Sequence, residues 1–283
     1  MSSARAGVSR LPLWVLPLRS MVARGRGSLG GRGSLYLAER HALVYRHTWL
    51  VFVSGVVEPL FYLLSIGVGL GELVGQVHLP GGQSVGYAAF VAPALLASAS
   101  MNGALFDSTF NVFFRLKYEK LYDAALATPM RSGDVALGEI SWALLRGVLY
   151  AAAFLVVMAA MGLIHSWWAL AALPAAVLTG FAFAAAGMAC TTYMRSWQDF
   201  EFITLATLPM FLFSTTFYPL SVYPRGIQYV VEITPLYQSV AVLRGLTLGL
   251  VSPGLLWNVG YLAVLGLAGL LVAGRRIGRL LLT

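Results

Sequence analysis

Charged residues are scarce in this sequence, and lysine is almost absent. Of 283 residues, 11% are Asp, Glu, Lys or Arg, whereas a typical soluble domain carries about 25%. The hydrophobic fraction is 59%, and Lys117 and Lys120 are the only lysines. The composition therefore predicts a membrane protein rather than a soluble domain.

Residue patterns that carry catalysis or bind metals are also missing. The single cysteine, Cys190, excludes an internal disulfide and a cysteine-based metal site. The sequence has no G-x-x-x-x-G-K-[ST] loop for ATP phosphates and no G-x-S-x-G turn for a serine hydrolase. The four histidines, at positions 41, 47, 78 and 165, lack the spacing of metal ligands. We expect a chain that is not an enzyme and holds no cofactor or metal, so energy for any transport must come from another protein.

Six apolar stretches are long enough to cross a membrane. About 20 helical residues, at about 1.5 Å each, span a hydrocarbon core of about 30 Å. The stretches are residues 49–70, 87–106, 137–164, 168–191, 202–220 and 255–274. They predict an all-α, polytopic membrane protein with six transmembrane helices.

Basic residues are distributed unequally among the segments between these stretches. Most lie before residue 49, in the second and fourth loops, and after residue 274. The first and third loops have no lysine or arginine, and the fifth has Arg225 and Arg244. The positive-inside rule places both termini and the second loop in the cytoplasm. We therefore expect a multi-pass protein of the cell membrane.

The amino-terminal region is basic and rich in glycine. Residues 1–33 predict a flexible cytoplasmic tail, which we interpret as a tether near anionic lipid rather than a nucleic-acid-binding arm. Residues 34–49 regain helical patterning and predict an interfacial helix leading into the first span. The remaining chain, residues 34–283, then forms a single six-span transmembrane domain.

The fifth loop contains two apolar helical stretches that are too short to cross the membrane. They cover residues 227–231 and 236–250 and are separated by Pro235. They predict helices that either dip into the membrane from outside as re-entrant elements or lie flat on the outer leaflet. Both arrangements keep the backbone amides hydrogen-bonded.

The longest charge-bearing segment between two spans is residues 113–139. At helical spacing it has one apolar face and another on which Arg115, Glu119 and Asp123 recur every fourth residue. Pro129 should end this helix. The pattern predicts a short cytoplasmic amphipathic helix, which serves either as an interfacial anchor or as a docking element for a soluble partner.

Two charged residues fall deep inside predicted spans. Glu58 and Arg146 each lie about 14 Å from the cytoplasmic start of a span, at about 1.5 Å per residue. An isolated charge at that depth is costly, so we expect a structural ion pair between them. A proton relay or a substrate contact is the alternative. Four other acids near cytoplasmic span ends are expected to be solvated or to face a partner: Asp107, Glu139, Asp199 and Glu201.

Segments in a fixed order along residues 40–275 carry a family resemblance. They are Glu58-Pro59 in a first span that closes on GVGLG at 67–71, and FVAPALLASASMNGALFDSTFNVFFRLKYEKLYDAALATPM at 90–130. They continue with FSTTFYPLSVYP at 213–224 and ITPLYQSVAVLRGL at 233–246. With six spans and no ATPase motif, they resemble the permease subunit of type-2 ATP-binding-cassette (ABC) exporters, nearest to the branch of nodulation-factor and drug exporters.

This resemblance implies two permease copies, expected as a homodimer, and separate ATPase subunits that bind ATP and Mg. It implies that residues 113–130 form a coupling helix seated in an ATPase groove, and that the fifth-loop helices are re-entrant helices near an outer gate. The implied substrate is amphiphilic or lipid-linked, such as a glycolipid, an oligosaccharide or a drug, moved outward. The implied docking residues are Phe114, Arg115, Lys117, Tyr118, Glu119, Lys120, Leu121 and Asp123.

Three other functions compete with this one. A proton-coupled secondary transporter would need two homologous halves and paired intramembrane carboxylates, and the three-span halves show no repeat. A membrane enzyme acting on lipid carriers would need clustered acids or histidines, which are dispersed here. A membrane assembly protein without transport is the third alternative.

Overall fold

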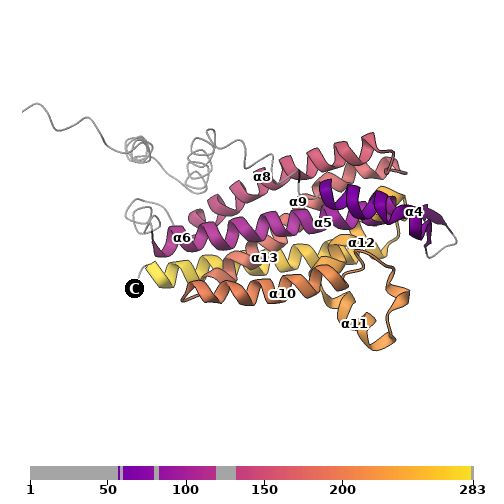
Figure 1. Cartoon of the computed structure of the whole chain (residues 1–283). Coiled ribbons are helices and arrows are strands. Elements are labelled where there is room, and N and C mark those ends of the chain that lie inside the picture. Colours follow the sequence, from indigo (N-terminus) through magenta and orange to yellow (C-terminus); the bar gives the residue numbers. More distant parts are fainter. Residues whose placement is uncertain (1–56, 58–59, 80–82, 119–131, 282–283) are drawn as a thin grey trace, which may run out of the picture.

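The computed structural model describes residues 57, 60–79, 83–118 and 132–281, which form an elongated bundle of helices (Figure 1). One end carries α6 (Val112–Lys117) and the last turns of α13 (Gly254–Leu281). The opposite end carries α4 (Gly71–Val74) and a short β-hairpin. We call these the α6 end and the hairpin end.

Four helices among the described residues are long and apolar enough to cross a membrane. They are Tyr87–Lys117, Val135–Ala160, Trp167–Thr191 and Gly254–Leu280. They correspond to the second, third, fourth and sixth predicted spans. The first of them is α5 (Tyr87–Phe106), which continues through the π-helical segment η2 (Asp107–Asn111) into α6. The second lies in α8 (Ser132–Ala160), and the third combines the 3-10 turn η3 (Trp167–Ala171) with α9 (Ala172–Thr191).

The first and fifth predicted spans are not established by the described residues. For the first, the described part is the helix Leu60–Val74, which includes the π-helical η1 (Leu63–Gly69). The predicted tail, the interfacial helix and most of the first half of this span lie outside the described residues. For the fifth, α10 (Phe200–Phe213) has 14 residues, too few to cross alone.

The helix α10 ends before the predicted boundary at residue 220 because the chain turns after Phe213. Thr215 has a positive φ of 58°, which is incompatible with a continuing right-handed helix. Residues 214–216 are buried. Arg244 of α12 (Pro235–Leu248) donates a hydrogen bond to the Thr215 carbonyl at 2.7 Å. The group that stabilises this break thus lies 29 residues away in sequence, so no local pattern predicts it.

Two helices occupy the predicted fifth loop, after the short turn η5 (Leu220–Val222). The first, α11 (Arg225–Ile233), exposes Tyr229 and Val230. The second, α12, begins after Thr234, whose side chain accepts a hydrogen bond from the Tyr237 amide at 3.4 Å, and it has proline in its first turn, where no helical amide is needed. It packs against α5, α9 and α13.

The hairpin end contains strands that the sequence did not predict. The strand β1 (Gln76–His78) pairs antiparallel with β2 (Ser84–Gly86), and Val77 lies opposite Val85. Gly75, with a φ of 72°, redirects the chain from α4 into β1, a conformation that glycine adopts at little cost. The strictly all-α expectation is therefore wrong in this detail.

The centre of the bundle is α9, which packs against α5, α8, α12 and α13. Its buried residues are mostly alanine, glycine and threonine, and small side chains let membrane helices approach closely. At Gly269 of α13, a Cβ atom would lie 2.6 Å from the backbone carbonyl carbon of Ala185. The contact between α13 and α9 therefore depends on the absence of a side chain at this position.

Replacing Gly269 with valine should separate α13 from α9 and lower the thermal unfolding temperature. The added atoms would overlap backbone atoms that cannot rotate away, and such overpacking typically costs about 1–3 kcal/mol. Gly260→Val on the same helix is the matched control, because a Cβ there has open space around it. Tryptophan fluorescence during heating in detergent measures the difference, and equal unfolding temperatures for the two variants would contradict this packing.

Candidate functional site

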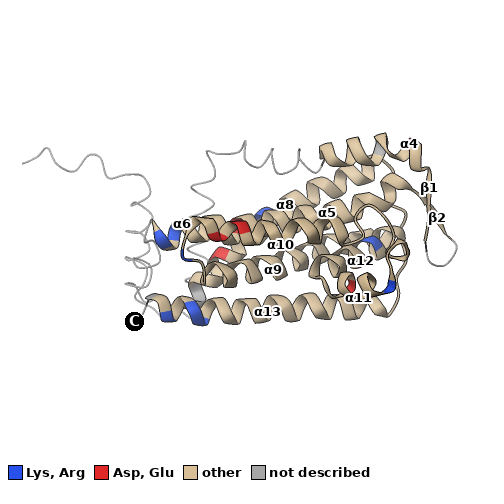
Figure 2. Cartoon of the chain, turned by 60° about the horizontal axis from the view of Figure 1, so that its bottom comes forward, with Lys and Arg blue, Asp and Glu red and all other residues tan. Residues whose placement is uncertain are grey.

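Two buried ion pairs join the α6 end of the helix Tyr87–Lys117 to α8. Arg115 pairs with Glu139, and Arg146 Nη2 lies 2.5 Å from Asp107 Oδ1. Asp107, Glu139 and Arg146 are each only 5% exposed. Figure 2 shows the acidic residues of this helix and of α8 gathered in the half of the bundle next to α6. We call these four residues the ion-pair joint.

The joint includes a π-helical segment that is also held by α9. Within η2, Asn111 Nδ2 donates a hydrogen bond to Asp107 Oδ1 at 2.8 Å. On the α9 side, Thr191 Oγ1 donates to the Ser108 carbonyl at 3.2 Å. A Cβ on Gly187 would lie 2.5 Å from Ser108 Oγ, so the two helices are in close contact. Short π-helical segments within α-helices are frequent at functional sites.

An aromatic cluster fixes the same helix end to the turn before α10. Phe110 stacks on Phe200 with ring centroids 4.2 Å apart, and Phe113 meets Phe200 edge to face at 5.2 Å. Trp197, in the turn η4 (Trp197–Asp199), contacts the rings of Phe110 and Phe114. Each aromatic pair contributes about 0.5–1.5 kcal/mol beyond the area it buries. The helix end is thus tied to α8 by charge and to α10 by ring contacts.

This arrangement falls within a family match that covers residues 34–248, the ABC-2 type transporter family. The chain belongs to this family. It is similar to Nodulation protein J of Rhizobium leguminosarum bv. viciae, with 31% identity over 237 residues, 83% of this chain and 90% of that protein. It is also similar to Nodulation protein J of Rhizobium leguminosarum bv. trifolii, with 34% identity over 227 residues, 80% of this chain and 85% of that protein. A third similar protein is Nodulation protein J of Rhizobium meliloti (strain 1021), with 34% identity over 212 residues, 74% of this chain and 79% of that protein. The predicted resemblance to type-2 ABC permeases is confirmed.

Four of the docking residues predicted for this ABC-2 transporter are described: Phe114, Arg115, Lys117 and Tyr118. Residues 112–117 continue the membrane helix, so the predicted helix start at Phe113 is wrong. Most of the predicted amphipathic helix, from residue 119 onward, lies outside the described residues. Lys117 and Tyr118 are exposed at the α6 end, whereas the Arg115 side chain is 12% exposed and pairs with Glu139. The other four lie outside the described residues: Glu119, Lys120, Leu121 and Asp123.

The buried charges of the ABC-2 transporter differ from those expected. Glu58 lies outside the described residues, and the described ion-pair partner of Arg146 is Asp107. The prediction that Asp107 and Glu139 are solvated or face a partner is wrong, because the helix continues past Phe106 and each acid is buried against an arginine of the neighbouring helix of the same chain.

The helical spacing of the charged residues in the sequence could have predicted the ion-pair joint. Asp107, Asn111 and Arg115 are spaced every fourth residue, and Glu139 and Arg146 are seven apart. Both spacings place the residues on one helix face. Each face carries one acid and one arginine, so two consecutive antiparallel helices can pair the acid of each with the arginine of the other, provided that the predicted second span is extended beyond its apolar stretch.

Asp199 is half-buried and caps the turn before α10. Its carboxylate binds backbone amides and, among the described residues, no basic side chain. Its Oδ2 accepts hydrogen bonds from the backbone amides of Arg195 at 2.6 Å and Ser196 at 3.1 Å. These amides lower the pKa of the Asp199 carboxyl below its ordinary value, because they stabilise the charged form. The cap therefore keeps its charge, and its contribution to stability, until the pH falls through that lowered pKa. Glu201 is exposed, as expected.

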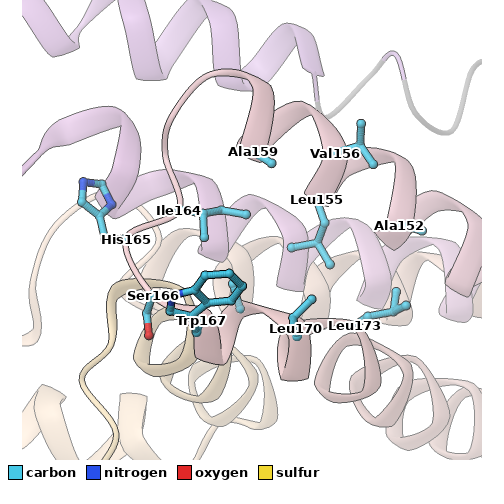
Figure 3. Close-up of a pocket in the computed structure, with 11 residues that line it drawn as sticks. Ala152, Leu155, Val156, Ala159, Ile164, His165, Ser166, Trp167, Leu170 and Leu173 are labelled. Atoms are coloured by element: carbon cyan, nitrogen blue, oxygen red, sulfur yellow. The ribbon is translucent and has the colours of Figure 1, made fainter.

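Two cavities lie on the sides of the bundle. One, of about 590 Å³, lies near the hairpin end, where Figure 3 shows Leu155 of α8 facing Trp167 and Leu170. No lysine, arginine or acid lines it. The other, of about 710 Å³, lies between α9 and α10 and has Arg195 and Asp199 in its lining.

Proposed function

We propose that this chain is the permease subunit of an ATP-driven exporter that moves an amphiphilic or lipid-linked substrate outward across the cytoplasmic membrane. A glycolipid, an oligosaccharide or a drug is the expected cargo. ATP and Mg are bound by a separate ATPase subunit that docks on residues 113–130. Membership of the ABC-2 type transporter family supports this assignment.

The ion-pair joint is the observation that carries the coupling proposal. The predicted docking segment begins in α6 and leads into α8, and the pairs Arg115–Glu139 and Asp107–Arg146 hold α8 against the helix Tyr87–Lys117. The aromatic cluster adds α10 to the same unit. A displacement of the docking segment by the ATPase would therefore move three membrane helices together instead of bending one of them.

Charge asymmetry supports a cytoplasmic location for the α6 end. Among the described residues, α6 carries Arg115 and Lys117, the end of α13 carries Arg275, Arg276 and Arg279, and Arg195 precedes the turn η4 that packs on the same helix end. Arg225 and Arg244 belong to α11 and α12, which lie toward the hairpin end (Figure 2). Cytoplasmic segments are enriched in lysine and arginine. The carboxyl terminus lies at the α6 end (Figure 1), and we place both termini in the cytoplasm.

Six crossings are proposed, with α10 and residues 214–220 together forming the fifth. Non-helical backbone is tolerated at membrane depth only where protein or water satisfies it. Residues 214–216 meet this condition, because they are buried and Arg244 bonds to Thr215. Burial of α12 within the bundle favours the re-entrant arrangement over one flat on the membrane. A second copy would pair through α10, whose Leu205, Leu208 and Leu212 face outward and are exposed.

Reversing the charges of Lys117 and Lys120 should release the ATPase. The double variant Lys117→Glu/Lys120→Glu replaces attraction with repulsion at the docking face, and each like-charge contact costs several kcal/mol at an interface. Affinity purification of the tagged permease from its native host, followed by identification of the retained ATPase, measures the effect. We expect the ATPase to co-purify with the unaltered chain, and the amount that co-purifies with the variant to be at least about tenfold lower.

The matched control is Arg225→Glu, which changes the charge of an exposed residue near the hairpin end. It should retain the ATPase fully. If Lys117→Glu/Lys120→Glu retains as much ATPase as the unaltered chain, these two lysines are not part of the docking surface. Substrate transport by the purified chain without any ATPase would favour the proton-coupled alternative.

A further inference from the structure

The cavity between α9 and α10 has no part in the proposed coupling. Its volume is about 710 Å³, and its lining includes Phe183, Cys190, Tyr193, Arg195, Ile203 and Met210. Among the described elements, α10 is contacted mainly at its two ends, by the turn η4 with its aromatic cluster and by α12. The middle of α10 therefore stands away from α9.

The length of the apolar wall matches one leaflet. The α10 side of the lining runs from Asp199 to Met210, which is about 16 Å of helix at 1.5 Å per residue. The hydrocarbon core is about 30 Å thick, so the cavity reaches from the α6 end roughly to the membrane centre. A single acyl chain that enters from the leaflet at the α6 end has this length and this apolar character.

One arginine lines the cavity and a second contacts its lining residue Tyr193. Arg195 is in the lining and its side chain is exposed. Arg276 of α13 stacks on the ring of Tyr193, with Cζ 4.1 Å from the ring centroid. The Nε of Arg276 is buried and has no hydrogen-bond partner among the described residues. The one acid in the lining, Asp199, is occupied by backbone amides.

We propose that this cavity binds an anionic phospholipid from the leaflet at the α6 end. One acyl chain lies between α9 and α10, and the phosphate lies between Arg195 and Arg276. Arginine is suited to this role because its planar group binds phosphate oxygens in pairs. The site does not depend on the ATPase, so it can be tested on the purified permease.

Cys190 provides a direct test, because it is the only cysteine in the chain and lines the cavity. The full-length permease is placed in lipid nanodiscs of phosphatidylcholine, with or without phosphatidylglycerol. The rate of Cys190 labelling by a fluorescent maleimide is measured in each. The ratio of the two rates is compared between variants, so that changes in intrinsic thiol reactivity cancel.

We expect phosphatidylglycerol to slow labelling, and Arg195→Gln to weaken this protection by about fivefold, the effect of one arginine on anionic-lipid binding. Arg276→Gln should do the same, and Arg225→Gln near the hairpin end should not. A Cys190→Ser/Ala159→Cys chain is the second control, since Ala159 lines the uncharged cavity of Figure 3. Its labelling reports the general effect of a negative membrane surface.

Three results would overturn the proposal. Equal protection of Cys190 in both disc types would exclude an anionic lipid. Equal slowing at Ala159→Cys would assign the effect to surface potential. A bifunctional maleimide that cross-links Cys190 between two chains would show that a second copy covers the cavity. The cavity would then be an interface between permease copies and not a lipid site. Inorganic phosphate added to phosphatidylcholine discs should give no protection, because it lacks the chain.

Discussion

Replacing Arg244 with methionine is expected to raise amide hydrogen exchange in residues 214–223 by about 5- to 150-fold. Arg244 donates hydrogen bonds to the carbonyls of Thr215 at 2.7 Å and Phe90 at 3.2 Å, and its Cζ lies 3.8 Å from the centre of the Phe90 ring. An unsatisfied buried carbonyl costs about 1–3 kcal/mol, which raises the equilibrium constant for local opening of the backbone by the same factor of about 5 to 150. Hydrogen exchange with mass spectrometry on the permease in nanodiscs measures it.

Two controls separate the role of the guanidinium from that of its charge. Arg244→Lys keeps a positive charge but cannot form the planar fork and the ring contact together, so its exchange should lie between those of the unaltered chain and Arg244→Met. Arg225→Met changes an exposed arginine in the neighbouring α11 and should leave exchange at residues 214–216 unchanged. If Arg244→Met exchanges no faster than Arg225→Met, Arg244 does not position the break after α10.

Replacing Arg146 with methionine is expected to destabilise the permease by about 3–5 kcal/mol, the usual effect of removing one partner of a buried ion pair. Asp107 would lose its counter-charge while only 5% exposed, and one of its oxygens already lacks a hydrogen-bond partner among the described residues. Unfolding in detergent with increasing denaturant, followed by tryptophan fluorescence, measures the free-energy difference. The same variant should reduce ATP-driven transport, because it breaks one of the two ion pairs between the helix Tyr87–Lys117 and α8.

The double variant Asp107→Asn/Arg146→Met is the informative comparison. Asparagine removes the uncompensated charge and can still accept the hydrogen bond from Asn111. Replacing a buried pair by neutral groups is often nearly neutral for stability, so we expect the double variant to recover more than half of the lost free energy. Lys117→Met at an exposed position should change stability by no more than about 0.5 kcal/mol. A double variant as unstable as Arg146→Met alone would show that Asp107 does not need Arg146.

Much of the fold could be predicted because the membrane imposes a simple rule on length and hydrophobicity. The predicted second span begins and ends at the bounds of α5, and the fourth ends with α9 at residue 191. The prediction failed where a helix continued past the end of its apolar stretch, as from Phe106 to Lys117, and where a helix stopped inside an apolar stretch, as at Phe213. Hydrophobicity measures the length of an apolar stretch, and it does not report where hydrogen bonds between helices extend or interrupt a helix.

The sequence pattern singled out the α6 end as a docking segment, which stays a prediction, and it did not predict the contacts of the residues there. Lys117 lies exposed at the α6 end, where the charge pattern of residues 113–123 indicated a docking segment. Arg115, from the same pattern, turned out to bind Glu139. One helical face can meet either solvent or another helix, and periodicity alone does not distinguish these two environments.

The sequence by itself determined that this is a helical membrane protein of the ABC-2 type transporter family without the motifs of an ATPase, because composition, span length and segment order are properties of the chain alone. Only the tertiary structure decided which buried charges are partners. Asp107 and Arg146 are far apart in sequence, as are Arg244 and Thr215. A buried charge is stabilised by whichever groups the packing of the helices brings within hydrogen-bond distance.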